Sequence, residues 1–212
     1  MRTSFLRALS LLFVSAAAAS AQVPPGCDPP KELPAGKRPA DVFNSLGAWY
    51  AQRNNNRCAI AAFEAALRDD PHFADARYNL GLALLQSGDA QRAVRELGTL
   101  AAQSPASPPA HLALGIALED SGNPAGAEAQ YREAIRLDAR SAVALQHLGD
   151  LLAAQKRYTA AATYLRQAVA LEPRGADHQV SLAQALYENG QADAAIELLT
   201  KTVAALPRSA LA

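Results

Sequence analysis

Apolar residues recur along the chain at a fixed interval of 34 residues. The pair Leu46-Gly47 returns as Leu80-Gly81, Leu114-Gly115 and Leu148-Gly149, and Leu182-Ala183 takes the fifth place. An interval kept five times without an insertion predicts a repeat architecture, in which each unit folds in the same way. The predicted units are residues 40–73, 74–107, 108–141, 142–175 and 176–209.

Each unit is predicted to contain two helices. The residue four positions after the leucine is apolar in every unit, and residues four apart lie on one face of a helix. These residues are Tyr50, Leu84, Leu118, Leu152 and Leu186. The second helix carries an alanine (Ala59, Ala93, Ala127, Ala161, Ala195) and, four residues later, a bulky residue (Phe63, Leu97, Tyr131, Leu165, Leu199). Small residues at Gly47, Gly81, Gly115 and Ala183 are expected to face those alanines and to let the paired helices approach closely.

Turn residues separate the helices. The break within the unit holds Gly88, Gly122 and Gly190 in three units, Asn54–Asn56 in the first and Lys156-Arg157 in the fourth. Glycine and asparagine tolerate the positive φ with which many helices end. A proline, which cannot continue a helix, follows the second helix in four units (Pro71, Pro105, Pro173, Pro207), and Ala139 stands there in the third.

This pattern resembles the tetratricopeptide repeat family over Ala40 to about Ser209. The features that match are the Leu-Gly pair, the alanine, the bulky residue, a further small residue at Ala66, Ala134 and Ala168, and the closing proline. The family's early tryptophan position departs from the pattern and is occupied by Phe43, Arg77, His111, Leu145 and Gln179, which suggests looser packing at Arg77 and Gln179. The resemblance implies an all-α, right-handed solenoid of five stacked helix-turn-helix repeats that binds proteins and needs no cofactor.

In a solenoid of this family, the first helices line the inner groove. A second stripe on each first helix would then point into it: Asp75, Tyr78, Leu82 and Leu85; Pro109, Leu112, Ile116 and Glu119; Val143, Gln146, Asp150 and Ala153; Asp177, Val180, Gln184 and Tyr187. The middle of this groove is apolar and its surroundings are acidic, and exposed apolar patches usually mark contact sites. We therefore expect an apolar, neutral-to-basic peptide to bind along Tyr78, Leu82, Leu85, Leu112, Ile116 and Glu119. The alternative is that these side chains pack against one another or against the N-terminal segment.

Residues 1–21 are predicted to be a secretory signal peptide. Arg2 and Arg7 precede a short uncharged run and the sequence Ala19-Ser20-Ala21, an A-x-A cleavage site. An uncleaved anchor is the alternative, although the run is shorter than the roughly 20 residues that span a bilayer. Export to the bacterial periplasm or beyond is therefore expected. A proline-rich, extended lead over residues 22–39 would follow.

The two cysteines, Cys27 and Cys58, would both reach an oxidising compartment, where they can form a disulfide. Two free thiols remain the alternative, because sequence spacing fixes no geometry. A bridge would hold the lead against the first unit.

Charge and candidate chemistry exclude several other functions. The chain has 20 basic and 20 acidic side chains, and loss of Arg2 and Arg7 would leave 18 against 20, a net charge of −2. Such a balance, with no basic block, argues against a nucleic-acid partner. His72, His111, His147 and His178 fall at different repeat positions and are interpreted as scattered surface histidines, so no metal site, catalytic group or enzyme activity is predicted.

Three functions remain open from the sequence. The first is a non-catalytic protein–protein interaction scaffold of the cell envelope. The second is an accessory, substrate-recruiting part of an envelope-biogenesis enzyme, or a fragment of a longer multi-domain protein, because residues 210–212 resemble the start of a sixth unit or a cap. The third is self-association through the last helix, where Ile196, Leu199 and Val203 are expected to be partly uncovered.

Overall fold

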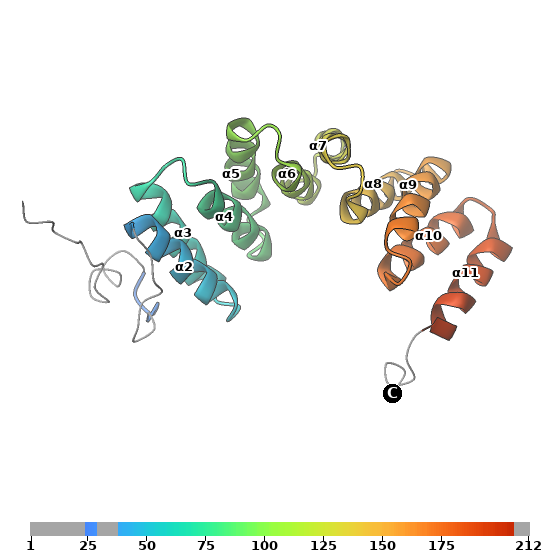
Figure 1. Cartoon of the computed structure of the whole chain (residues 1–212), viewed down its shortest axis with the longest axis horizontal. Coiled ribbons are helices and arrows are strands. Elements are labelled where there is room, and N and C mark those ends of the chain that lie inside the picture. Colours follow the sequence, from blue (N-terminus) through green and yellow to red (C-terminus); the bar gives the residue numbers. More distant parts are fainter. Residues whose placement is uncertain (1–23, 29–37, 206–212) are drawn as a thin grey trace, which may run out of the picture. The chain divides into compact units, whose positions relative to one another are not determined.

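The computed structural model describes residues 24–28 and 38–205, and within them it contains ten α-helices and no strand. The helices are α2 (Pro39–Ala51), α3 (Asn56–Asp69), α4 (Ala74–Gln86), α5 (Ala90–Gln103), α6 (Pro108–Asp120), α7 (Pro124–Leu137), α8 (Ala142–Ala154), α9 (Tyr158–Leu171), α10 (Ala176–Glu188) and α11 (Ala192–Ala205) (Figure 1). The expected signal peptide (1–21), most of the expected lead (22–39) and residues 210–212 lie outside the described residues.

The helices recur in step with the sequence. From α4 onward the first helix of each pair begins 34 residues after the previous one, at Ala74, Pro108, Ala142 and Ala176. The second helices do the same, starting at Asn56, Ala90, Pro124, Tyr158 and Ala192. Each predicted unit therefore contains one pair of helices, and the predicted all-α repeat fold is confirmed.

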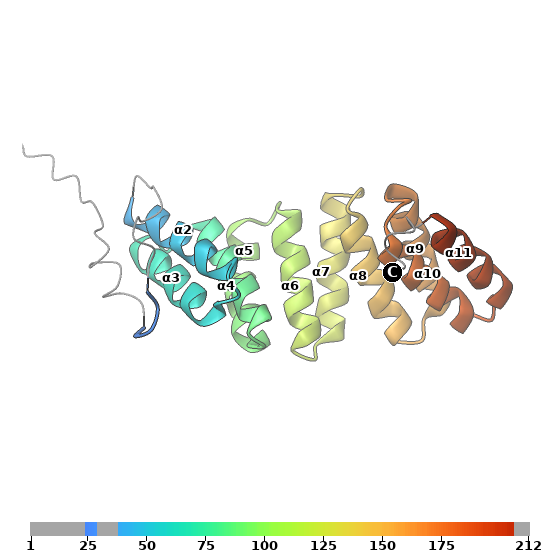
Figure 2. The same ribbon diagram turned by 90° about the horizontal axis from the view of Figure 1, so that it is seen from below.

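The chain divides into two compact units, with the division between Glu96 and Leu97, inside α5. In the first unit α2 packs against α3, and α4 packs against both. In the second unit the pairs α6–α7, α8–α9 and α10–α11 each pack together, α7 contacts α8, and α10 contacts α8 and α9 (Figure 2). Because α8 and α10 touch directly, the first helices of the last two repeats are neighbours.

Side chains fix where several helices begin. The Asn55 side chain accepts a hydrogen bond from the backbone N–H of Cys58 (3.3 Å), and Asn123 does the same for Gly126 (3.0 Å). Ser107 and Ser141 cap α6 and α8 in the same way. Each cap satisfies a backbone donor that the first turn of a helix leaves without a partner.

A left-handed residue ends every first helix at the same repeat position. The φ angles are 56° at Asn54, 81° at Gly88, 80° at Gly122, 61° at Lys156 and 78° at Gly190. The positive φ expected at these turns is confirmed, and Lys156 adopts it without the conformational freedom of glycine.

The second helices end in the same register whether or not a proline follows. In the third repeat Ala139 replaces the proline, yet α7 still ends at Leu137. The carboxylate of Asp138 accepts a hydrogen bond from the backbone N–H of Arg140 (3.0 Å), and the Asp138 carbonyl accepts one from Ser141 (3.2 Å). A hydrogen-bonded turn therefore stops the helix where the proline is missing.

The glycine of the Leu-Gly pair makes room for the bulky residue of the second helix. A Cβ atom at Gly47 would lie 2.5 Å from the Phe63 ring, and one at Gly149 would lie 2.5 Å from Cγ of Leu165. The atoms nearest to a Cβ at these glycines thus belong to the bulky residue of the second helix. In each of these pairs a glycine without a side chain lies opposite a large side chain, as dense packing requires.

Polar residues at the family's tryptophan position are held by one recurring contact. Arg77 donates to the carbonyl of Pro71 (2.6 Å), and Gln179 donates to the carbonyl of Pro173 (2.5 Å). Nε2 of His111 lies 3.0 Å from the carbonyl of Pro105. Each partner lies six residues earlier, in the preceding loop. The looser packing expected at Arg77 and Gln179 is therefore replaced by a hydrogen bond that ties the helix to that loop.

Candidate peptide-binding surface

The predicted contact residues of the first unit lie on α4. Tyr78, Leu82 and Leu85 are all half-buried, and none of the three is fully covered. On the same helix, Leu80 and Leu84 are buried. The inward stripe and the second stripe are thus separate faces of α4, as the spacing indicated.

The predicted contact residues of the second unit lie on α6 and are largely occupied by internal contacts. Leu112 and Ile116 are half-buried and pack against a cluster that includes Leu148 and Leu152. Glu119 accepts a 2.6 Å hydrogen bond from the hydroxyl of Tyr131. Much of the stripe on α6 is therefore occupied by packing within the protein. This was the alternative that the sequence left open.

A buried tyrosine anchors Glu119. Burial raises the pKa of Tyr131, and the hydrogen bond to Glu119 raises it further, so the phenol stays protonated and donates. The Tyr131 ring stacks on His147, with ring centroids 5.4 Å apart. Glu119 is therefore positioned by the core and is not a freely moving surface acid.

The more open part of the stripe lies on α8 and α10. Val143 on α8 is exposed, and Val180 and Tyr187 on α10 are 51% and 64% exposed. Large apolar side chains with that much exposed surface indicate a contact face when they lie together on one face of a helix. Val180 and Tyr187 meet this condition because they lie about one helical turn to either side of Gln184.

A cavity of about 480 Å³ lies beside these residues, between α8 and α10. Its walls are Asp150, Ala153, Ala154, Tyr158, Ser181, Gln184, Ala185 and Glu188. Alanines supply its apolar surface, and the polar groups are acids, a hydroxyl, an amide and a phenol. The cavity falls within the size range of ordinary ligand pockets, roughly 300–1,000 Å³.

Asp150 is the central charged group of this cavity. The residue is exposed, but the cavity walls remove enough water from its carboxylate to raise the pKa above its usual value. Hydrogen bonds from Ser181 and Gln146 and the charges of His147 and His178 act in the opposite direction. The effect of burial on the carboxylate therefore outweighs the effect of these contacts.

Part of this cavity was predictable from the sequence. Asp150, Ala153 and Gln184 belong to the stripe expected in the groove, but they were not among the predicted contact residues. Ser181 and Glu188 were missed because each lies one position beside the stripe, and Tyr158 because it begins a second helix. The direct contact of α8 with α10, which brings them together, is a tertiary feature.

Two of the four histidines lie in the interior of the protein and contact neighbouring side chains. His111 and His178 are buried, which corrects their interpretation as surface residues. Nδ1 of His111 lies 2.8 Å from Gln130, and Nε2 of His178 lies 3.1 Å from Glu172. Across residues 24–28 and 38–205, no group of three or more His, Cys, Asp and Glu side chains is placed to hold a metal ion.

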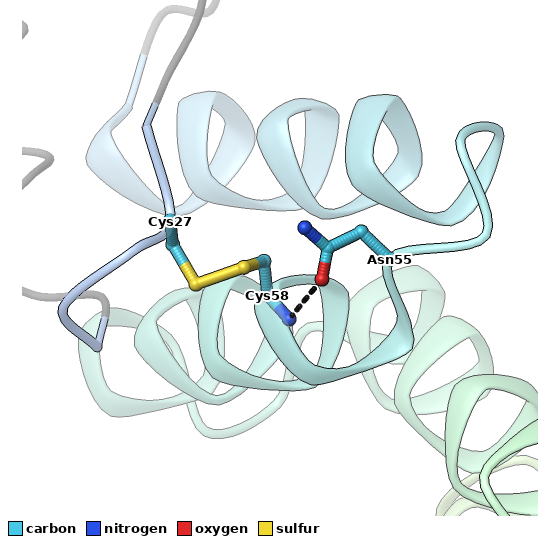
Figure 3. Close-up of a disulfide and its surroundings, with 3 residues drawn as sticks. All are labelled: Cys27, Asn55 and Cys58. Carbon is cyan, nitrogen blue, oxygen red and sulfur yellow. Dashed lines mark hydrogen bonds between the residues drawn. A yellow bond between two sulfur atoms is a disulfide. The ribbon is translucent and has the colours of Figure 1, made fainter.

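Cys27 and Cys58 form a disulfide in the structure, with their Cα atoms 5.5 Å apart (Figure 3). It joins the Pro24–Asp28 segment to the first turn of α3, next to the cap made by Asn55. Both cysteines are buried, so the disulfide lies in the interior of the first repeat.

In the described part of the chain, no helix combines the length and the apolarity that crossing a membrane requires.

Comparison with known proteins places the chain by sequence and by fold. A tetratricopeptide repeat model matches residues 50–111, 112–173 and 147–210. None of the curated proteins matches the sequence.

Several solved structures have the same fold. MamA from Desulfovibrio magneticus RS-1 is 20% identical and has a TM-score of 0.70, with 77% of this chain and 93% of that chain covered. TTC0263, a thermophilic tetratricopeptide repeat protein from Thermus thermophilus, is 23% identical, with a TM-score of 0.65 and coverages of 80% and 92%. YrrB, described as a tetratricopeptide repeat protein with an unusual peptide-binding site, is 19% identical, with a TM-score of 0.64 and coverages of 80% and 87%.

Proteins with this fold bind peptides or other proteins and are generally non-catalytic scaffolds. The repeat match extends over most of the sequence and agrees with the helix pairs, the shared turn and the 34-residue step described above. The chain belongs to the tetratricopeptide repeat family.

Proposed function

We propose that the protein is a non-catalytic scaffold of the cell envelope that binds a partner peptide along its first helices. The observation that carries this proposal is the open face of α8 and α10, where Val180 and Tyr187 are exposed beside a cavity. YrrB, with the same fold, is described as having a peptide-binding site. Tyr78, Leu82 and Leu85 on α4 and Leu112, Ile116 and Glu119 on α6 remain predicted contact residues.

Photo-crosslinking from the open face tests this function. A photoreactive amino acid is placed at Val180 or Tyr187, and at Gln167 as a matched control, because Gln167 is an exposed residue of the second helix α9. In an extract of its own envelope, we expect crosslinks to a protein from positions 180 and 187 and none from position 167. Equal crosslinks from all three positions, or none from the first two, would contradict peptide binding at this face.

Charge substitution gives a second test with little risk to folding. Val180→Asp and Tyr187→Asp place a charge on exposed positions, so they should remove partner capture and leave the helical circular dichroism signal unchanged. Ile116→Asp is a poorer choice because Ile116 packs against the core, so loss of folding would be confused with loss of binding. On α4, Leu82→Asp tests the predicted contribution of the first unit.

Export to the envelope is proposed from the predicted signal peptide at residues 1–21 and is supported by the Cys27–Cys58 bond, which an oxidising compartment allows. N-terminal sequencing of protein from a periplasmic fraction should begin at Gln22. A cytosolic protein that begins at Met1 and carries two free thiols would contradict export.

A second candidate is self-association through α11. Ile196, Leu199 and Val203 are exposed, as the sequence predicted, and they form one stripe along the helix. Sedimentation at two protein concentrations separates this candidate from binding to another protein.

A further inference from the structure

The charged side chains in the walls of the cavity between α8 and α10 are all acidic. Asp150 and Glu188 contribute carboxylates from the two helices, and none of its eight wall residues is Lys, Arg or His. Ser181, Gln184 and Tyr158 add oxygen atoms that accept hydrogen bonds. A ligand with several donors and a positive charge would match this set, because charge-assisted hydrogen bonds to carboxylates are the stronger kind.

Arg157 and Lys156, the basic side chains that follow α8, do not pair with these acids. Arg157 follows α8, but its Nη1 lies 2.8 Å from Glu128 and 3.0 Å from Gln155, so it is held by other groups. Lys156 is exposed at the left-handed turn and does not line the cavity. Asp150 receives hydrogen bonds from Ser181 and Gln146 and is influenced by the charges of His147 and His178, yet burial still raises its pKa above the usual value.

The rim of the cavity suits the apolar part of a long side chain. Val180 and Tyr187 flank Gln184, a wall residue, and both expose apolar surface to solvent. A lysine or arginine has a hydrocarbon stem that packs on such surface while its charged end reaches a polar site. An aromatic ring at the rim adds attraction for a cation that passes over its face.

We propose that this cavity is a subsite that holds an arginine or lysine side chain of the bound partner peptide. The proposal rests on the proposed function and deepens it, because it states the residue class that the partner must carry. Asp150 is the specificity-determining acid, Glu188 is the second, and Ser181 and Gln184 orient the cationic group. Val180 and Tyr187 contact the residues of the peptide on either side.

The subsite can be tested without knowing the partner. The purified protein is titrated with N-acetyl-argininamide, and backbone amide signals are followed by NMR. N-acetyl-citrullinamide, which has nearly the same shape and no charge, is the matched probe. We expect saturable shifts at Asp150, Ser181 and Gln184 with the arginine probe, and binding at least tenfold weaker with the citrulline probe.

A pair of substitutions assigns the effect to the cavity. Asp150→Asn keeps the shape of the side chain and removes its charge, and it should weaken binding of the arginine probe at least tenfold. Asp177→Asn is the control, since Asp177 is an exposed acid of α10 that does not line the cavity. It should leave the affinity within about twofold, a change small on the energy scale.

Each outcome decides the question. Equal binding of the two probes, no saturable shift, or an equal loss in the two variants would overturn the subsite. If crosslinks still form from Val180 and Tyr187 while the arginine probe fails, the peptide-binding function stands and the subsite falls. If the probe binds and no crosslink forms, the cavity binds a guanidinium group, but both the peptide-binding function and the assignment of the cavity as a peptide subsite fall.

Discussion

The first and the last repeat each contain one pair of helices, but the second helix is covered by neighbours in the first repeat and is more exposed in the last. In the first repeat Phe63 on α3 is 2% exposed, whereas Leu199 at the same repeat position on α11 is 39% exposed. Cys27 holds the Pro24–Asp28 segment to α3 through the disulfide, and within its own unit α3 also packs against α2 and α4. For α11, the described helix that packs against it is α10.

The difference shows that a repeat position does not determine burial by itself. Leu165 on α9 lies 34 residues before Leu199 and is fully buried, because α10 packs against α9. Ala162 is buried in the same way, and Ile196, its equivalent on α11, is 63% exposed. A repeat buries its apolar face through its neighbours, so the same sequence pattern gives a core in one place and an open surface in another.

Loss of the disulfide should have the largest effect, and only in the first repeat. Closing a loop of 31 residues corresponds to about 3–4 kcal/mol in the chain-entropy model, so Cys27→Ser with Cys58→Ser should lower the free energy of unfolding by about that amount. Trp49 on α2 is the single tryptophan of the chain and reports on this repeat by fluorescence.

Reduction of the wild-type protein should move the denaturant midpoint of Trp49 in the same direction as the double substitution. Leu199→Ala, at the other end of the sequence, is the control and should leave the Trp49 transition in place. A Trp49 midpoint that is the same with and without reductant would show that the bond contributes nothing to the first repeat.

A matched pair of leucines measures the contribution of a neighbouring helix. Leu165→Ala removes a fully buried side chain whose Cγ lies against Gly149, and it should cost about 3 kcal/mol. Leu199→Ala makes the same chemical change at a partly exposed position and should cost less than about 1 kcal/mol. Urea denaturation followed by circular dichroism compares the two, and equal losses would mean that α11 is covered as well as α9 is.

Substitutions at the left-handed turn position, which every repeat has, should change the free energy of unfolding by a smaller amount, and the sign depends on the residue that is replaced. Gly190→Ala places a side chain at φ 78° and should destabilise the last repeat by about 1–2 kcal/mol. Lys156→Gly removes a side chain at φ 61° and should stabilise the fourth repeat by up to about 1 kcal/mol. Thermal denaturation of both variants checks this, and a loss of stability in Lys156→Gly would show that its side chain contributes more than the backbone strain removes.

The fold was predictable because every repeat carries the same sequence pattern. Leu-Gly, the second-helix alanine and the turn residue each recur at one interval, so a single ambiguous unit is corrected by the others. Even the departures fit, since Ala139 replaces a proline without moving the end of α7. The exposure of Ile196, Leu199 and Val203 on the last helix was also predicted from the sequence.

The candidate site was predictable only in part. The stripe that contains Asp150 and Gln184 follows from helical spacing, but its openness depends on how neighbouring helices pack. Leu112 occupies the same repeat position as Val180, yet Leu112 packs against the core and Val180 is exposed. The cavity needs Tyr158 from α9 together with Ser181 and Glu188 from α10, and no local pattern marks them as partners.

The smallest change in stability is expected for the exposed stripe of α11, where association is the sensitive measurement. Ile196→Ser with Val203→Ser should change the free energy of unfolding by no more than about 0.5 kcal/mol, because both side chains are mostly in solvent. If the stripe is the contact between copies, the sedimentation coefficient of the wild-type protein rises with concentration and that of the variant does not. Val180→Ser is the matched control, since Val180 and Val203 are 51% and 52% exposed on different helices. It should leave self-association unchanged and weaken partner capture instead. If Val180→Ser also abolished self-association, the contact between copies would include α10. The exposure of the last helix would then not be enough to explain self-association.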